Sequence, residues 1–578
     1  MYIVDGEPDD GVTTPRNNYE SPFAHIARSE KPSGSEKARI TCEKAVITEA
    51  SGEHDELLAS CSEFESEDVP SMSKRRLWLA LAGLDALLFI AALDLTIIAT
   101  VYVEMASSFN ALTRAEWTVT SYMLAATATQ PLYGKFSDIL GRTWAIVFAV
   151  AVFLGGSIMC ATAQSMDMLV ASRAVQGLGG GGIMALIFVV VADVLSERER
   201  GRYIGVFTCT WGLASAVAPV LGGVIVQRAS WRWIFWLNLP VCAVALVLVL
   251  FCMRLPRPKG SAWQKARRLD VLGTLVFLAA ALPLLLGLSW GGREYAWSSA
   301  RVLGCVVGGL AGLGVFAAVE CLVAREPIVP PRLLRRRNVA LSAVAHFFYG
   351  AAAYGPIVFV PQWALLVCGS DAISAGTRLL PFTAGTVVTS VGGGLLMTHT
   401  GRYRRLLVVG SLLLALGNGL FLVFAQHTSQ LVQACVLVLC GLGAGAVIQP
   451  LMMAAQAAVD GRDMAAATTL CAFLRSLGGI ICVAVLSSVG HSVVRQGLAR
   501  VVAGQPSAVF VVVRVAENQA AVFAPGVPDA LRSAVVAVFA KAMHVSFVAL
   551  LPFGVLLLVV CLAFEHIELN RERKQTIE

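Results

Sequence analysis

Charged side chains are scarce in this sequence. Of its 578 residues, 14% are Asp, Glu, Lys or Arg, whereas 57% are hydrophobic. A soluble domain usually carries about 25% charged residues, so the composition excludes an ordinary soluble globular protein. Apolar runs of roughly 20 residues recur along the chain, which is the length of a helix that crosses a bilayer. The sequence therefore predicts an all-α polytopic membrane protein.

Several patterns that carry chemistry in other proteins are absent. The 14 cysteines contain no Cys-x-x-Cys pair, and the sequence has no phosphate-binding loop and no nucleophile motif. We therefore expect no cofactor, no metal and no enzymatic activity, and pumping driven by ATP is disfavoured. The formal net charge of +7 is expected to reflect basic cytosolic loops, so nucleic acid is not an expected partner.

The two ends of the chain differ from its middle. Residues 1–73 are rich in Ser, Glu, Asp and Pro, which predicts a disordered cytosolic tail. The basic flank at 74–76 places this end in the cytosol, and a second cytosolic tail is expected at 566–578. Between the tails we count fourteen apolar segments, the second of which covers 117–137. Each segment is near the roughly 20 residues that a bilayer requires.

An internal repeat divides these segments. The Gly-Arg pair at 141–142 recurs at 401–402, and each pair has a glycine seven residues before it. We therefore predict two six-helix halves with two extra helices inserted between them. The predicted parts are an N-terminal half at 74–253, a linker with the two extra helices at 254–337, and a C-terminal half at 338–565 that includes an outer loop at 490–541.

A proline and small residues mark the fifth segment. Pro219, Gly222 and Gly223 follow a run of Ala and Gly and precede Trp-Arg-Trp at 231–233. Small residues let helix backbones approach closely in lipid. The pattern resembles the antiporter motif of the major facilitator superfamily, and its continuation resembles the fourteen-helix drug:proton antiporter branch of fungal toxin and multidrug efflux type. For the proline–glycine pattern alone, any tightly packed pair of membrane helices is the alternative.

The loop between the second and third segments carries another motif. Gly134, Asp138, Gly141 and Arg142 match the superfamily signature Gly-x-Leu-x-Asp-x-x-Gly-Arg. The resemblance implies the major facilitator fold, in which parallel halves enclose the substrate site near the midplane. We expect Asp138 to meet the N-terminus of the thirteenth segment near Met464, because a helix dipole favours an anion there.

The same loop is expected to be tied to the cytosolic end of the fourth segment. We predict an ion pair between Arg142 and Asp193. We hypothesise that these contacts act as a gate and hold the cytosolic side closed in the outward-open state. A solvated ion pair in a cytosolic turn is the alternative, since exposed pairs contribute little to stability.

Two charges lie deep in apolar segments. Arg173 is on the fourth segment, and an arginine inside a membrane span marks function because it is costly to bury. Asp94 is on the first segment, and a rise of about 1.5 Å per residue puts the two at depths that helix tilt would make level. The resemblance implies proton coupling by this arginine, and we expect protonation of Asp94 to release Arg173. A permanent structural pair that never titrates is the alternative.

Other polar and aromatic residues inside the segments are candidates for the wall of a substrate cavity. These are Gln130, Gln176, His346, Tyr354, Gln449 and Arg475. A histidine in such a place is more often a satisfied structural residue. Arg475 is the better candidate, because it is charged and far from either end of its segment.

These features predict a proton-coupled efflux transporter that exports a small hydrophobic or amphipathic organic compound. The resemblance implies a fungal secondary metabolite, toxin or drug as cargo and the plasma membrane as location. We expect a monomer with both termini in the cytosol. Two alternatives stay open: a vacuolar antiporter of basic amino acids and protons, and a nutrient sensor without transport. Asp94 is the only clear carboxylate deep in a segment, which disfavours cationic cargo.

Overall fold

The chain is helical throughout the part that the structure describes. This computed structural model describes residues 73–565 apart from 110, 112–113, 115–116, 196, 254–269, 293–294, 325–326, 371, 460, 505–521 and 524–526. No β-strand occurs among those residues, which confirms the predicted all-α class. The predicted tails at 1–73 and 566–578 lie outside the described residues, except for Ser73.

Six long helices make up the first part of the bundle. They are α3 (Lys74–Ser107), α4 (Trp117–Leu140), α5 (Arg142–Ala161), α6 (Met166–Val194), α7 (Glu197–Arg228) and α8 (Trp233–Cys252). Their apolar side chains form one core that runs from Leu77 to Met253. Helix α3 packs on α6, α7 and α8, and α6 packs on α4 and α5.

Six further long helices make up the last part of the bundle. They are α13 (Arg337–Leu366), α15 (Leu380–Thr400), α16 (Arg404–Leu420), α17 (Gln430–Ala457), α18 (Met464–Gly504) and α20 (Asp529–Leu562), with the short helices α12 (Pro331–Arg335) and α14 (Ala372–Thr377) beside α13. A second core runs from Ala345 to Phe564. Helix α13 packs on α18 and α20, and α17 packs on α15 and α16.

Repeated glycines allow equivalent helices of the two parts to approach closely. A Cβ at Gly179 of α6 would overlap the backbone of Phe153 on α5. The matching Gly443 of α17 would overlap the backbone of Leu414 on α16 in the same way. The glycine repeat of the sequence therefore corresponds to a repeat in helix packing.

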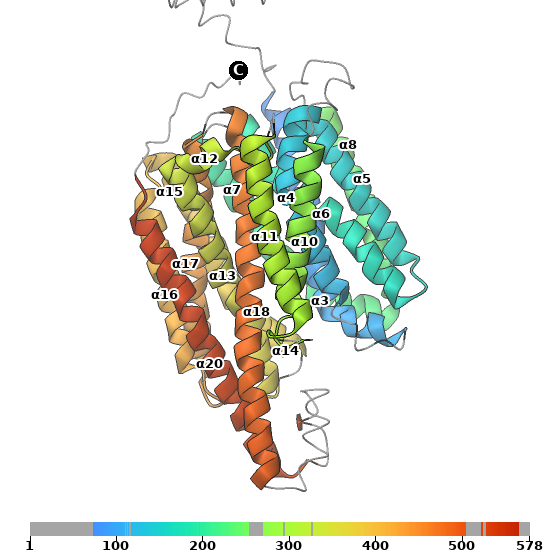
Figure 1. Cartoon of the computed structure of the whole chain (residues 1–578), viewed down its shortest axis with the longest axis vertical. Coiled ribbons are helices and arrows are strands. Elements are labelled where there is room, and N and C mark those ends of the chain that lie inside the picture. The colour runs from blue at the N-terminus through green and yellow to red at the C-terminus, as the bar shows by residue number, and fades with distance from the viewer. Residues whose placement is uncertain are drawn as a thin grey trace, which may run out of the picture. The chain divides into compact units, whose positions relative to one another are not determined.

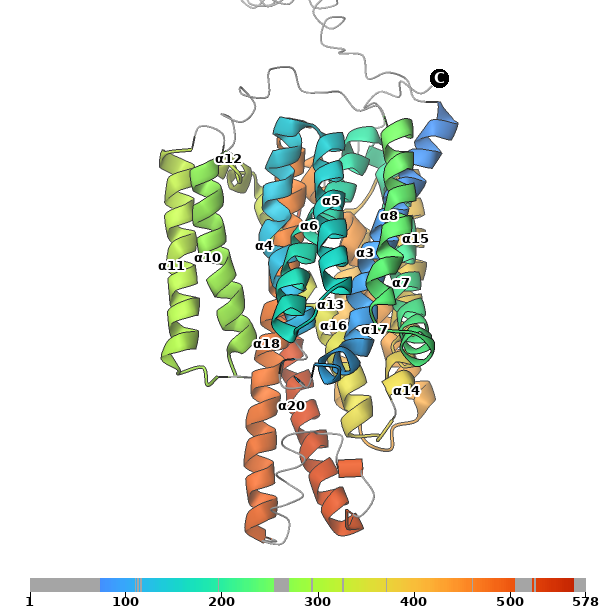
Figure 2. The ribbon, with the colours of Figure 1, turned by 90° about the vertical axis from the view of Figure 1, so that its right-hand side faces the viewer.

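Two helices stand between these parts in the sequence and pack beside them. Helices α10 (Val271–Trp290) and α11 (Ala300–Leu322) lie side by side in both ribbon views (Figures 1 and 2). Phe277 of α10 packs against Phe316 of α11 and Phe473 of α18, with ring centres 5.1 and 5.6 Å apart. Helix α10 also contacts α4, so the inserted pair covers the seam between α4 and α18.

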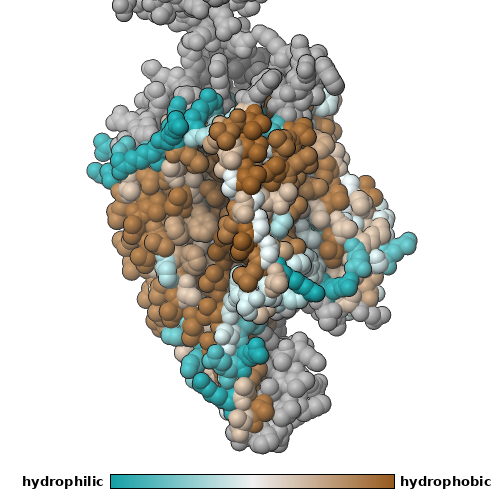
Figure 3. All heavy atoms as spheres, viewed as in Figure 1, coloured by the Kyte–Doolittle hydropathy of each residue, from teal (hydrophilic) through white to brown (hydrophobic). Residues whose placement is uncertain are grey.

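The described helices have the composition of a multi-pass membrane protein. Thirteen of them are long and apolar enough to cross a membrane. Helix α4, on the predicted segment 117–137, is not among the thirteen and is rich in Thr and Ser. The count of fourteen spans therefore stays a prediction. Hydrophobic residues cover the flank in Figure 3, and hydrophilic residues gather toward both ends.

The predicted outer loop at 490–541 is largely helical where it is described. Helix α18 continues to Gly504, and α20 begins at Asp529. A Cβ at Gly497 would lie 2.5 Å from Cγ1 of Val538, so the two extensions pack on each other. In Figures 1 and 2 they reach beyond the neighbouring helices. The two helical extensions, 490–504 and 529–541, contain no proline, and Pro528 immediately precedes α20, so both helices continue where a loop was expected.

The contact between α13 and α18 gives a test of this packing. A Cβ at Gly478 would overlap the carbonyl oxygen of Phe347, and backbone atoms cannot move aside as a side chain would. We expect Gly478→Ala to lower the stability by about 1–3 kcal/mol, the usual penalty of overpacking. Thermal unfolding of the purified protein measures the effect. Gly314→Ala is the matched control, because nothing lies within 4 Å of a Cβ at that position. Equal melting temperatures for the two variants would contradict the prediction.

Candidate functional site

A buried ion pair joins α3 and α6. Nη1 of Arg173 donates a hydrogen bond to Oδ2 of Asp94 at 2.6 Å, and both side chains are 0% exposed. The structure thus brings together the two charges that the sequence placed at similar depths. Removing one partner of such a buried pair leaves an uncompensated charge, which typically costs about 3–5 kcal/mol.

Three uncharged side chains surround this pair. Oε1 of Gln176 accepts from Nη1 of Arg173 at 2.6 Å. The carboxylate oxygen Oδ1 of Asp94 accepts from Nε2 of Gln176 at 2.9 Å and from Nδ2 of Asn238 at 3.0 Å. Both amides also donate to Oγ of Ser157, at 2.8 and 3.1 Å. The network therefore links α3, α5, α6 and α8 through hydrogen bonds in a dry interior, where each bond is costly to lose.

Two members of the network were not singled out as site residues in the sequence. Ser157 and Asn238 are uncharged, and a single Ser or Asn in a membrane helix is a weak signal. The apolar surroundings of Asn238 were the one available indication. Gln176 was predicted to line the substrate cavity, but the structure places it in this network.

Arg173 also contacts the wall of a cavity. Its Nε donates to the carbonyl oxygen of Thr118 at 2.9 Å, and its guanidinium carbon lies 4.4 Å from the centre of the Tyr122 ring. Nη2 of Arg173 is buried and has no hydrogen-bond partner. Tyr122 lines the cavity, so one aromatic ring contacts both the cavity and the guanidinium of Arg173.

The cavity has a volume of about 350 Å³ and is lined by helices of both parts of the bundle. The predicted residues Gln130 and Tyr354 line it, from α4 and α13 respectively. Its larger apolar and aromatic lining residues are Leu95, Tyr102, Tyr122, Met123, Met184, Trp211, Leu288, Val358 and Ile480. None of the described lining residues carries a formal charge. A concave, mostly apolar site of roughly 300–1,000 Å³ suits a small organic molecule.

Three other predicted cavity residues are not among the lining residues. Nδ1 of the buried His346 lies 2.8 Å from the backbone carbonyl oxygen one helical turn earlier. Nε2 of Gln449 donates to Oγ of Ser390 at 2.8 Å. Arg475 is half-buried on α18 and immediately precedes Ser476, which does line the cavity.

The predicted Arg142 ion pair is present where α4 turns into α5. Gly141 has a φ of 95°, in the region that favours glycine, and Arg142 begins α5. Nε of Arg142 donates to Oδ2 of Asp193 at 2.6 Å, and its Nη1 donates to Oδ1 of Asp138 at 2.5 Å. We call this end of the bundle the Arg142 end. The expected contact of Asp138 with the start of α18 is not among its described bonds, because the adjacent arginine takes the carboxylate.

Gly134 makes the contact with α18 that was expected of Asp138. A Cβ at Gly134 would overlap Oγ1 of Thr469 and lie 3.1 Å from the carbonyl oxygen of Ala465. The glycine therefore lets the backbone of α4 approach α18 one helical turn before the carboxylate. The motif does join the two parts of the bundle, but through close backbone packing rather than through a charge at a helix terminus.

The two parts also meet elsewhere on the Arg142 side of the cavity. Oγ of Ser390 on α15 donates to Oγ1 of Thr208 on α7 at 2.9 Å. A buried apolar cluster joins α6 to helices of the last part, and its members include Ala192, Leu333, Val339, Val459 and Met464. The structure is thus closed between the cavity and the Arg142 end.

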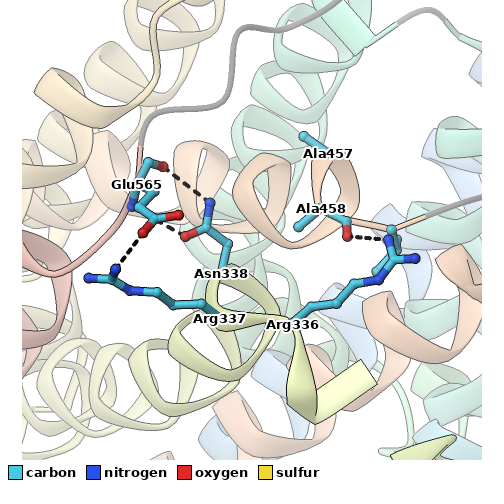
Figure 4. Close-up of a pocket in the computed structure, with 7 residues that line it drawn as sticks. Arg336, Arg337, Asn338, Ala457, Ala458 and Glu565 are labelled. Atoms are coloured by element: carbon cyan, nitrogen blue, oxygen red, sulfur yellow. Dashed lines mark hydrogen bonds and ion pairs between the residues drawn. The ribbon is translucent and has the colours of Figure 1, made fainter. Parts of the chain in front are cut away.

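A second pocket, of about 320 Å³, lies at the Arg142 end (Figure 4). Nδ2 of Asn338 donates to the carbonyl oxygen of Glu565 at 3.1 Å, and Nη1 of Arg336 donates to the carbonyl oxygen of Ala458 at 2.8 Å. These bonds join the start of α13 to the ends of α17 and α20. The polar groups that line the pocket are therefore hydrogen-bonded to one another. Among the described residues, no group of three or more His, Cys, Asp or Glu side chains is placed to hold a metal ion.

The proline–glycine pattern lies on α7, which runs through it without interruption. The side chain of Pro219 is outside the described residues. Gly222 is buried, but nothing lies within 4 Å of a Cβ built at Gly223. The expectation that both glycines permit close helix packing is therefore wrong for Gly223, which borders open space.

Several known proteins resemble this chain in sequence, in fold or in both. The model of the Major Facilitator Superfamily matches residues 84–483. The efflux pump MMF1 of Pseudozyma antarctica is 35% identical over 416 residues, which are 71% of this chain and 77% of that protein. The efflux pump FUS6 of Gibberella fujikuroi is 31% identical over 508 residues, or 87% and 91% of the two chains.

A solved structure supports the fold independently. The crystal structure of the human organic anion transporter MFSD10 superposes with a TM-score of 0.55 over 84% of this chain and 99% of that one, at 15% sequence identity. Likeness at this identity concerns the fold alone, whereas the match over residues 84–483 concerns the sequence. The chain therefore belongs to the Major Facilitator Superfamily.

Proposed function

We propose that this protein is a proton-coupled efflux transporter that exports small hydrophobic or amphipathic organic compounds. The observation that carries the proposal is the uncharged cavity between the two parts of the bundle, with the buried pair of Asp94 and Arg173 behind its Tyr122 wall. Relatives named as efflux pumps support the direction of transport. The cavity offers no carboxylate to a cationic substrate, so no observation favours basic amino acids as cargo.

Asp94 is the proposed proton site. In the structure its carboxylate accepts from Arg173, Gln176 and Asn238. Protonation removes the charge that compensates Arg173, and an uncompensated buried charge is strongly unfavourable. Arg173 then gains from any rearrangement that gives its guanidinium water or another partner. Because the guanidinium lies on the Tyr122 ring, such a rearrangement would change the cavity wall.

The contacts at the Arg142 end act as the proposed gate. Arg142 holds Asp138 of α4 and Asp193 of α6, and Gly134 brings α4 against α18. Opening toward this end requires α4 and α18 to separate. The basic residues of the loops support a cytosolic location for this end by the positive-inside rule, and on that orientation the proposed gate is closed on the cytosolic side. We place the protein in the plasma membrane as a monomer with fourteen spans and cytosolic termini.

Metabolite analysis tests the export function directly. Mass spectrometry compares the contents of cells and medium for cells with and without the gene. A compound that is retained in cells only when the gene is absent supports export and identifies a cargo. An unchanged medium together with altered vacuolar basic amino acids would contradict it.

Replacement of the proposed proton site has a defined consequence. We expect Asp94→Asn to lower the export rate driven by a pH gradient by about tenfold or more, because a site that cannot titrate cannot link transport to protons. Transport of the identified cargo into proteoliposomes with an imposed gradient measures the rate. Asp167→Asn is the matched control, since this outer carboxylate is 81% exposed and pairs with Arg114. Unchanged gradient dependence in Asp94→Asn would refute its role.

Loss of the Arg142 ion pairs is expected to open the cytosolic side. Charged hydrogen bonds contribute about 1.5–3 kcal/mol each, so Arg142→Gln should raise the open population by about tenfold or more. A cysteine placed by Thr469→Cys, at the contact with Gly134, reports opening through its labelling by a water-soluble maleimide, read by peptide mass spectrometry. Arg532→Gln, which removes an ion pair with Asp529 elsewhere, serves as control. Equal labelling in the Arg142→Gln and control backgrounds would count against the gate.

A further inference from the structure

Arg475 is a cation in the middle of the bundle that has no counterion among the residues the structure describes. A rise of about 1.5 Å per residue puts it about 16 Å from the start of α18 at Met464, which is near the centre of a bilayer core of about 30 Å. The side chain is half-buried. No hydrogen bond or ion pair joins its guanidinium to any residue that the structure describes.

Arg475 lies on a face of α18 that lines the cavity farther along the helix. Residues three and four apart share a helix face, so Arg475 lies on the face that carries Gly479 and Val483. Both of these residues line the cavity, as does Tyr354, which packs on Gly479. Arg475 therefore lies at the edge of the cavity lining, next to Ser476 and one helical turn before Gly479, on the side of the Arg142 end.

The helices of the last part of the bundle supply no carboxylate at this depth, and Asp138 on α4 and Asp193 on α6 are held by Arg142. Helices α13, α15, α16, α17 and α18 contain neither Asp nor Glu, and in α20 the single carboxylate, Asp529, is in the first turn. On the other side, Asp94 is already held by Arg173. The titratable neighbours of Arg475 include His346 and Tyr349 on α13 and Cys471 on α18, and none of these is a carboxylate.

The contrast with Arg173 indicates what Arg475 is suited for. Arg173 is fully buried beside Asp94, whereas Arg475 is half-buried and unpaired. An unpaired guanidinium at this depth is costly, and such residues mark substrate or ion pathways. A guanidinium offers paired donors that match a carboxylate. The apolar and aromatic cavity wall beside it suits the rest of an amphipathic molecule.

We propose that Arg475 binds the acidic group of the cargo, so that the preferred substrates of this transporter are amphipathic organic carboxylates. The inference rests on the proposed efflux function and adds the chemical class of the substrate. The hydrocarbon or aromatic part of the carboxylate occupies the cavity beside Tyr122 and Tyr354. The carboxylate lies one helical turn deeper, on the guanidinium of Arg475.

Binding of two matched probes tests this proposal. The purified full-length protein is titrated at neutral pH with 1-pyrenebutyrate, which is a carboxylate, and with its uncharged methyl ester, and binding is followed by fluorescence. We expect the wild type to bind the carboxylate about tenfold or more tightly than the ester, as for one charge-assisted pair. Arg475→Gln should abolish this preference and leave ester binding unchanged. Arg475→Lys, which keeps the charge but not the paired donors, should retain part of it.

Arg378→Gln is the control for the loss of a positive charge. Arg378 lies near the other end of the bundle, where it donates hydrogen bonds to Gln433 and Ser370. The variant Arg378→Gln should keep the preference for the carboxylate over the ester. Equal affinities for the two probes in the wild type, binding of neither probe, or a preference that survives in Arg475→Gln would each overturn the inference. Transport of the ester in proteoliposomes under a pH gradient separates the two proposals. Ester transport without any carboxylate preference would reject the substrate class alone, and absence of gradient-driven transport for both probes would count against the efflux function.

Discussion

The ion pair between Asp94 and Arg173 is the interaction on which the N-terminal half depends. Two charges can be buried at 0% exposure only if each compensates the other and most of the remaining polar atoms find partners, as all but Nη2 of Arg173 do here. Gln176, Asn238 and Ser157 supply those partners from three helices. The network therefore fixes how α3, α5, α6 and α8 pack. In the proposed mechanism, a single proton on the Asp94 carboxylate would change this packing.

The two parts of the bundle share a packing plan but differ in their charges. Matching glycines bring α6 onto α5 and α17 onto α16, as expected for a repeated unit. The first part contains a compensated ion pair, and the second contains Arg475, which pairs with none of the described residues. The cavity lies between these charges, with Tyr122 on one side and Tyr354 on the other. In the proposed mechanism, the first part carries proton coupling and the second recognises the acidic group of the cargo.

Charged residues were predicted from the sequence better than uncharged ones. Asp94 and Arg173 were paired from depth alone, because few charges are available inside a membrane and each needs a partner. Asn238 was not assigned to the site, since an amide can be satisfied in many ways. The sequence predicts that Asp138 contacts the start of α18. In the structure Asp138 pairs with Arg142 instead, and Gly134 contacts α18. Competition among neighbouring partners depends on distances, which a linear pattern does not contain.

The central claim is that Asp94 changes its protonation state while Arg173 stays charged. Infrared difference spectroscopy of the purified protein over a series of pH steps measures this directly, with Asp94→Asn as the reference. The account predicts a carbonyl band of a protonated carboxylic acid that grows as the pH falls and is missing from Asp94→Asn. A carboxylate that stays ionised at every pH at which the protein transports its cargo would contradict the account and make the pair purely structural.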